Sequence, residues 1–101
     1  MRPAPATRIP DGLTHYRSTP VFNQATTPAA LMGDHCTKEG VWGRIRLLTG
    51  RLRYCVTDSR RAASSLELMP DGPPGIIEPD ILHRVEPIGD VEFQVEFWKA
   101  D

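Results

Sequence analysis

The sequence predicts an all-β domain, a sandwich or barrel built from many short strands. Ten prolines and eight glycines divide the chain into short pieces. No stretch of helical length carries apolar residues at the 3.6-residue spacing of an amphipathic helix. In residues 90–98, by contrast, Val91, Phe93, Val95 and Phe97 alternate strictly with polar residues, which is typical of a half-buried strand. With 101 residues, the chain is long enough for one domain with a modest core.

A second strand pair is predicted around Thr49-Gly50, interpreted as the two-residue turn of a hairpin. Residues 41–48 and 51–56 would then pair, with residue 46 opposite residue 53. This register gives the pair one apolar and one basic face. The apolar face holds Ile45, Leu47, Leu52 and Tyr54, and the basic face holds Arg44, Arg46, Arg51 and Arg53.

The rest of the chain carries weaker strand signals separated by turns. Strands are expected near residues 14–22, 29–36, 64–69, 75–78 and 81–87. Residues 69–75 are rich in proline and glycine and predict a turn, as do residues 88–90. Residues 58–65 are expected to form a polar loop with a short helical turn at residues 60–63. The domain is expected to span residues 9–101, after a loose tail over residues 1–8.

Composition narrows the classes of function. The formal net charge is −1, with acidic and basic residues spread along the chain, so nucleic acid and anionic membranes are not expected as partners. No apolar run is long enough to span a bilayer, and the first residues lack the apolar core of a signal peptide. A cytoplasmic location is therefore the default expectation. Cys36 and Cys55 are then expected to be free thiols.

Several blocks of residues occur in an order and spacing that one known family shares. They begin with Pro20-Val21-Phe22, continue through residues 40–43 and 48–54, and end with His83-Arg84-Val85-Glu86. On these blocks the chain resembles the TehB/YeaR-like family of small cupin domains. The resemblance implies a cupin-type double-stranded β-helix, or jelly-roll barrel. It also implies an accessory or stress-related role, because such domains occur alone or ahead of the methyltransferase of the tellurite-resistance protein TehB.

The resemblance further implies a reduced metal site. Typical cupins hold a metal through three histidines and a glutamate, but here only His35 and His83 remain as imidazoles, and Gly43 stands at the usual glutamate position. Glu39 would add a carboxylate to these two histidines and so complete a set of three metal ligands. Such a set suits a divalent metal ion (Zn, Fe, Mn or Ni) and leaves positions open for water or substrate. Alternatively, both histidines are neutral imidazoles that are hydrogen-bonded at the mouth of the barrel.

Three functions are consistent with these residues, and the first is preferred. It is a metal-binding cupin with an accessory role, with a small molecule or an oxyanion as ligand. The second is a metal-dependent enzyme, for which Lys38, Glu39 and Tyr54 are candidate acids or bases. The third is a metal-free interaction module. Cys36 is interpreted as a small, half-buried apolar residue in preference to a thiolate that captures an oxyanion.

The basic face of the predicted hairpin is the clearest charge feature. Like charges opposite each other on a sheet are unfavourable, so these arginines need partners. Glu92 and Glu96 are predicted to supply them, in preference to an anionic ligand. Trp42 and Trp98 lie among these charges, and exposed tryptophans beside arginines are typical of protein interfaces. A homodimer built on this surface is one interpretation; the other is that each tryptophan covers a barrel edge within the monomer.

Overall fold

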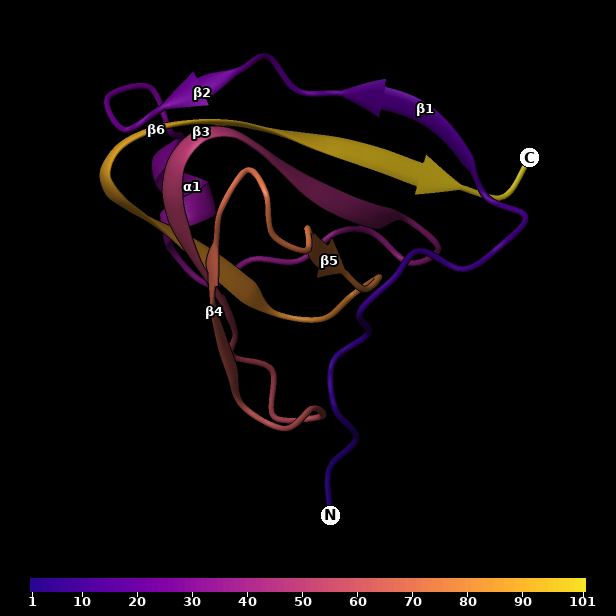
Figure 1. Ribbon diagram of the computed structural model, residues 1–101. Helices are drawn as coiled ribbons and strands as arrows, with labels where there is room; N and C mark the ends of the chain where they lie inside the picture. Colours follow the sequence, from indigo (N-terminus) through magenta and orange to yellow (C-terminus); the bar gives the residue numbers. More distant parts are fainter.

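Six strands form one strongly curved antiparallel sheet in the computed structural model, which describes residues 1–101 (Figure 1). The sheet order is β1-β6-β3-β4, while β2 also pairs with β6 and β5 with β3. The all-β prediction is confirmed, and the finer prediction of a cupin-type double-stranded β-helix stays a prediction. The elements are β1 (Thr14–Ser18), β2 (Phe22–Asn23), α1 (Ala29–Met32), β3 (Trp42–Val56), β4 (Ser64–Leu68), β5 (Gly75–Ile77) and β6 (His83–Lys99).

Strands β3 and β6 form the frame of the molecule. They pair along their whole length, from Trp42 opposite Trp98 to Val56 opposite His83. Both ribbons bend sharply near their middles, so that the sheet curves around its own inner face (Figure 1). Residues 88–90, predicted as a tight turn, lie inside β6 and contribute to this bend instead of reversing the chain.

The hairpin predicted at Thr49-Gly50 is wrong, because β3 runs through these residues without reversing. Gly50 pairs with Val91 of β6, and the register shifts on both sides of this position. Its φ of +78° lies in the left-handed region, and a side chain there would collide with the backbone of Asp90. A glycine is therefore required at the bend, and the sequence signal of a turn marks a bend within one strand.

The predicted division of side chains between two faces nevertheless holds. The register shifts change which alternate residues point inward, so odd-numbered residues before the bend and even-numbered residues after it face the core. On the inner face, Ile45, Leu47, Leu52 and Tyr54 are all buried. On the outer face, Arg46, Arg51 and Arg53 are exposed, and Arg44 is half-buried.

The strand predicted over residues 29–36 is also wrong, because residues 29–32 form the four-residue helix α1. Pro28 precedes a run of good helix formers, which favours a helix start there. Leu31 packs on the hydrophobic core, which draws this segment onto the sheet. The other weak strand predictions are confirmed by β1, β2, β4, β5 and the first part of β6.

The connections follow the predicted turns more closely. Gly72 donates its N–H to the carbonyl of Met69 between β4 and β5. A hydrogen-bonded turn joins Asp58 to Arg61 in the predicted polar loop, but the helical turn predicted at residues 60–63 does not form, and β4 already begins at Ser64. No helix in the structure has the length and hydropathy that crossing a membrane requires.

Candidate functional site: a cavity beside two histidines

The structure brings His35 and His83 together. His35 lies in the loop between α1 and β3, and His83 begins β6. Each donates its backbone N–H to the carbonyl of the other, at 3.0 Å and 2.8 Å. Their ring centroids are 4.1 Å apart, with an angle of 61° between the ring planes. Two residues far apart in sequence thus form one imidazole pair.

Backbone carbonyls fix the orientation of both rings. Nδ1 of His35 lies 3.0 Å from the carbonyl oxygen of Gly33, and Nδ1 of His83 lies 3.0 Å from that of Ile81. Because a carbonyl only accepts, each Nδ1 carries the hydrogen, and in the neutral ring Nε2 keeps a free lone pair. Both histidines can therefore accept a hydrogen bond, or bind a metal, through Nε2.

Burial sets the charge of the inner histidine. His83 is only 1% exposed, while His35 is half-buried. Burial lowers the pKa of His83 to about 4. The hydrogen bond with Ile81 opposes this shift, and the neighbouring His35 adds to it. His83 is therefore neutral near pH 7.

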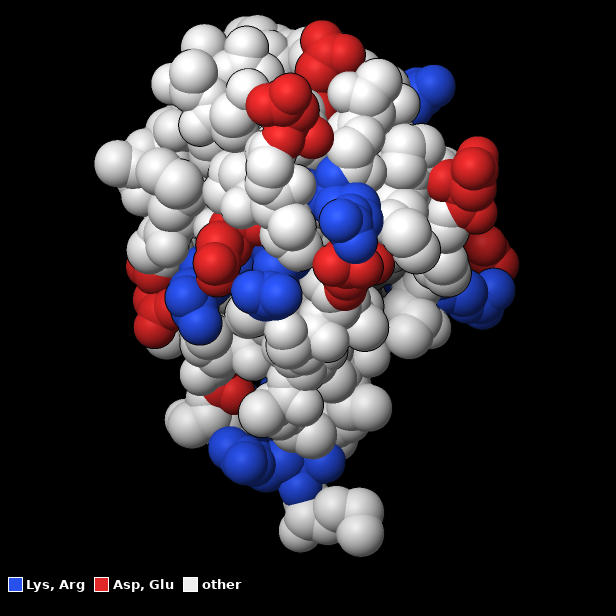
Figure 2. Space-filling view, turned by 60° about the vertical axis from the view of Figure 1, so that its left-hand side comes forward, with Lys and Arg blue, Asp and Glu red and all other residues white.

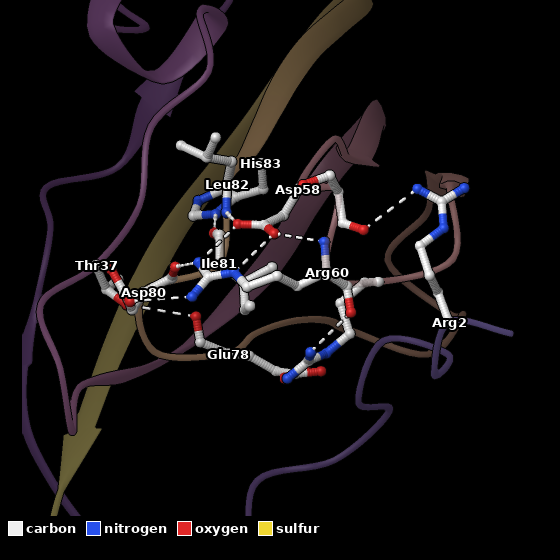
Figure 3. A network of polar contacts seen from close by, with 11 residues as sticks. Arg2, Thr37, Asp58, Arg60, Glu78, Asp80, Ile81, Leu82 and His83 are labelled. Atoms are coloured by element: carbon white, nitrogen blue, oxygen red, sulfur yellow. Dashed lines mark hydrogen bonds and ion pairs between the residues drawn. The ribbon is translucent and has the colours of Figure 1, made fainter.

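A polar network holds the backbone immediately before His83 (Figure 3). The buried carboxylate of Asp58 accepts hydrogen bonds from the Arg60 side chain at 2.8 and 2.9 Å and from the Leu82 N–H at 3.0 Å. The Leu82 carbonyl in turn accepts from the N–H groups of Thr57 and Asp58. The Arg60 side chain, followed by the Leu82 N–H, keeps the pKa of Asp58 well below its usual range.

The same network ties the His35 loop to the start of β6. Arg60 also donates to the carboxylate of Asp80 at 3.3 Å and to its carbonyl oxygen. The N–H of Asp80 reaches the carbonyl of Thr37, and the Thr37 hydroxyl donates to the carbonyl of Val41 at 2.7 Å. These contacts hold the two segments that carry the histidines against each other.

A cavity of about 310 Å³ lies beside the histidine pair on the inner face of the sheet. The size and the mainly apolar wall are those of a small-molecule site. The polar or charged side chains on its wall include those of Arg17, His35, Lys38 and His83, and no aspartate or glutamate lines it. The apolar wall includes Ile45, Ile77, Val85, Phe93, Val95 and Phe97.

The three predicted metal ligands do not meet. Glu39 is exposed in a turn with Gly40 and does not line the cavity. No group of three or more His, Cys, Asp or Glu side chains lies close enough together to hold a metal ion. The structure therefore pairs His35 with His83 and leaves Glu39 apart, because the loop turns away from the cavity between Lys38 and Val41.

The other predicted site residues differ in their access to the cavity. Lys38 lines it, and so does Cys36, which is exposed and not half-buried as predicted. Tyr54 is buried and donates its hydroxyl to the carbonyl of Ile76 at 2.8 Å. Burial, aided by the charge of Glu78, raises the pKa of Tyr54 well above its usual value, so this phenol stays protonated. Cys55 is buried and, like Cys36, is a free thiol.

Ion pairs cover most of the basic outer face, as predicted. In Figure 2, basic and acidic side chains lie beside one another over the face shown. Of the predicted partners, only Glu96 pairs with an arginine, while Glu92 accepts a hydrogen bond from Thr49. The pairs are Arg44–Glu96 at 2.8 Å, Arg51–Glu67 at 3.6 Å and Arg53–Glu86 at 3.7 Å.

The two tryptophans lie opposite each other at one end of the β3–β6 pair. Both are half-buried, and Arg44 lies over the Trp98 ring, with Cζ 5.2 Å from the ring centroid. The predicted homodimer on this surface stays a prediction, as does the cytoplasmic location.

Sequence reasoning missed Arg17 as a cavity residue and Asp58 as the anchor of the β6 start. Arg17 lies on β1, which pairs with the end of β6, so only the sheet topology brings it to the cavity. Asp58 lies in a polar loop whose composition is that of an ordinary solvent-exposed turn. Neither residue has a local sequence signal that could have identified it.

Comparison with known proteins decides the family. The sequence profile of the TehB-like domain matches residues 17–95. The chain belongs to the TehB-like domain family. It is 30% identical over 76 residues to TehB of Haemophilus influenzae, a probable S-adenosyl-L-methionine-dependent methyltransferase; the match covers 74% of this chain and 27% of TehB. It is 28% identical over 99 residues to YeaR of Escherichia coli K12, covering 92% of this chain and 83% of YeaR.

Solved structures agree with this TehB-like assignment. The crystal structure of Haemophilus influenzae TehB superposes with a TM-score of 0.81 at 26% identity, over 89% of this chain and 32% of that one. A crystal structure of an Escherichia coli K12 protein gives a TM-score of 0.79 at 28% identity, over 93% of this chain and 97% of that one. The chain thus spans about a quarter of TehB and most of YeaR.

Proposed function

We propose that this TehB-like domain binds a small molecule in the cavity beside His35 and His83. The observation that carries the proposal is the cavity itself, about 310 Å³ with a mainly apolar wall and a few polar groups on it. The apolar wall would bury the body of the ligand. The Nε2 atoms of the two histidines would accept hydrogen bonds from it and so orient it.

The polar network supports binding because it keeps the histidines in fixed positions. Asp58 and Arg60 hold the backbone before His83, and Asp80 links that backbone to the His35 loop. A site held in advance loses less conformational entropy when a ligand binds. TehB carries a similar domain within a longer chain named as a methyltransferase, which is consistent with an accessory role in which the domain binds a ligand.

Titration with hexanol, followed by two-dimensional NMR of the ¹⁵N-labelled protein, tests the proposal. We expect shifts confined to cavity-lining residues. Val41→Trp would fill the cavity and abolish them, whereas Leu66→Trp adds the same ring at an exposed position that does not line the cavity and would leave them unchanged. Shifts elsewhere, or binding that survives Val41→Trp in a folded protein, would contradict the proposal.

A metal site is a second candidate function, and the ring orientation favours it. Metal-bound histidines characteristically donate the other ring N–H to a carbonyl or carboxylate, and both Nδ1 atoms do so here. His35 and His83 would supply two ligands to a divalent ion, with the other positions left to water or a bound molecule. Two ligands are fewer than the three protein ligands of a typical catalytic zinc site.

Elemental analysis after dialysis against Zn²⁺ tests this second candidate. We expect retained zinc in the wild type and its loss in His35→Ala and His83→Ala variants that circular dichroism shows to be folded. Glu39→Gln and His15→Ala are the controls and would retain zinc, because neither residue lines the cavity. A metal-free wild type, or zinc that persists in both histidine variants, would exclude this site.

A further inference from the structure

Two cationic side chains from separate segments reach the cavity. Arg17 comes from β1, and its guanidinium lies over the ring of Phe97, with Cζ 5.2 Å from the ring centroid. Lys38 comes from the loop that carries His35. Arg17, Lys38 and Phe97 all line the cavity, and because Arg17 and Lys38 are both exposed, the two cations stand at its solvent-facing rim.

Neither cation is neutralised by the protein. Arg17 and Lys38 form no ion pair with a carboxylate, and no acidic residue lines the cavity. His83 is neutral and buried, so it adds no charge to the cavity lining. The cavity therefore has a net positive lining, although the chain as a whole has a formal charge of −1.

A concave site with charges of one sign beside a low-dielectric wall attracts a ligand of the opposite sign. A guanidinium matches the two oxygens of a carboxylate, and an ammonium adds a second donor group. The aliphatic and aromatic wall favours an apolar body on the same molecule. A fully hydrated inorganic ion would leave this wall without a partner.

We propose that the ligand of this cavity is a small organic anion, a monocarboxylate with an apolar body. Its headgroup contacts Arg17 and Lys38, and its body lies against the wall that includes Ile45, Phe93 and Val95. This inference rests on the proposed function and adds the chemical class of the ligand.

Calorimetric titration with hexanoate, hexanol and hexylammonium tests the inference, because these probes share a tail and differ in the headgroup. We expect hexanoate to bind about tenfold more tightly than hexanol, and hexylammonium to bind most weakly. In the double variant Arg17→Gln/Lys38→Gln the preference for hexanoate disappears, while hexanol still binds. The control Arg51→Gln/Arg53→Gln removes the same charge from the outer face and keeps the preference.

Two results would overturn the inference alone: equal or tighter binding of hexanol by the wild type, or a hexanoate preference that survives in the Arg17→Gln/Lys38→Gln variant. Binding of hexanol keeps the proposed function in both cases. If the folded wild type binds none of the three probes, the proposed function fails together with the inference.

Discussion

The molecule has basic residues on two surfaces that differ in how their charge is balanced. On the outer face of β3, three of four arginines pair with glutamates. At the cavity, Arg17 and Lys38 lie beside apolar side chains and two histidines, with no carboxylate on the wall. The first surface balances its charge within the fold. The second leaves its charge available to a ligand.

A run of charges in a sequence need not mark a functional site. The four arginines of β3 alternate with apolar residues along one strand, and this pattern is that of a solvated sheet face. The two cavity cations come from β1 and from a loop, and each looks unremarkable in its own segment.

Truncating the inner wall should have the largest effect on stability. Phe93 is 0% exposed and belongs to both the hydrophobic core and the cavity wall. Phe93→Ala should lower the free energy of unfolding by about 3–5 kcal/mol. Leu66→Ala, on the edge strand β4, should lower it by less than about 1 kcal/mol, because Leu66 is 49% exposed. Urea denaturation measures both, and similar losses would contradict the placement of Phe93 in the core and of Leu66 at the exposed edge of the sheet.

The buried histidine should make stability depend on pH. Its pKa is about 4 in the folded protein and about 6.5 when unfolded. As the pH falls from about 6.5 to 4, the unfolded chain takes up a proton that folded His83 does not. The free energy of unfolding should therefore fall by about 3 kcal/mol over this window, and this contribution should then level off.

Urea denaturation from pH 4 to 7, with a chelator present, measures this dependence. The His83→Gln variant should lose this contribution, and the exposed His15→Gln control should keep it. A wild type and a His83→Gln variant with the same pH slope would show that His83 is not the neutral, buried group described here.

The outer ion pairs should differ in strength according to burial. Glu96 is 8% exposed, so Arg44→Ala leaves a largely buried carboxylate without its partner. This change should lower the free energy of unfolding by about 2 kcal/mol. The exposed pair of Arg53 and Glu86 should contribute less than about 1 kcal/mol. Double-mutant cycles at low and high salt measure both pairs, and a stronger Arg53–Glu86 coupling would contradict this order.

The smallest effect is expected at the cavity cations of the ligand-free protein. Arg17→Gln should lower the free energy of unfolding by only about 0.5 kcal/mol, because the exposed Arg17 loses its contact with the Phe97 ring but has no acidic partner to lose. Thermal unfolding without ligand measures the change. A large destabilisation would show that Arg17 serves the fold and is not available to a ligand.

The sequence predicts a strand correctly where apolar and polar residues alternate strictly. It predicts the strand wrongly at Gly50. Residues 91–97 have the predicted inner face because each inward position is apolar. Thr49-Gly50 has the composition of a hairpin turn, but a left-handed glycine suits both a turn and a bend. Only the pairing of β3 with β6 along both halves distinguishes these two conformations.

The candidate site could be predicted only in part. His35 and His83 were found through the family resemblance, and the structure brings them together. Glu39 is the carboxylate predicted to complete the site, but the loop turns and leaves it exposed. Arg17 reaches the cavity through the pairing of β1 with β6, which is a long-range contact that no local pattern encodes.

The most direct test is to locate a bound ligand by intermolecular nuclear Overhauser effects between ¹³C-labelled hexanoate and the protein. The cavity assignment predicts contacts from the terminal methyl group to Ile45 and Val95, and from the methylene beside the carboxylate to Arg17 or Lys38. Contacts only with the outer face, near Arg51 and Arg53, would contradict the claim that the unbalanced charge of this domain serves ligand binding.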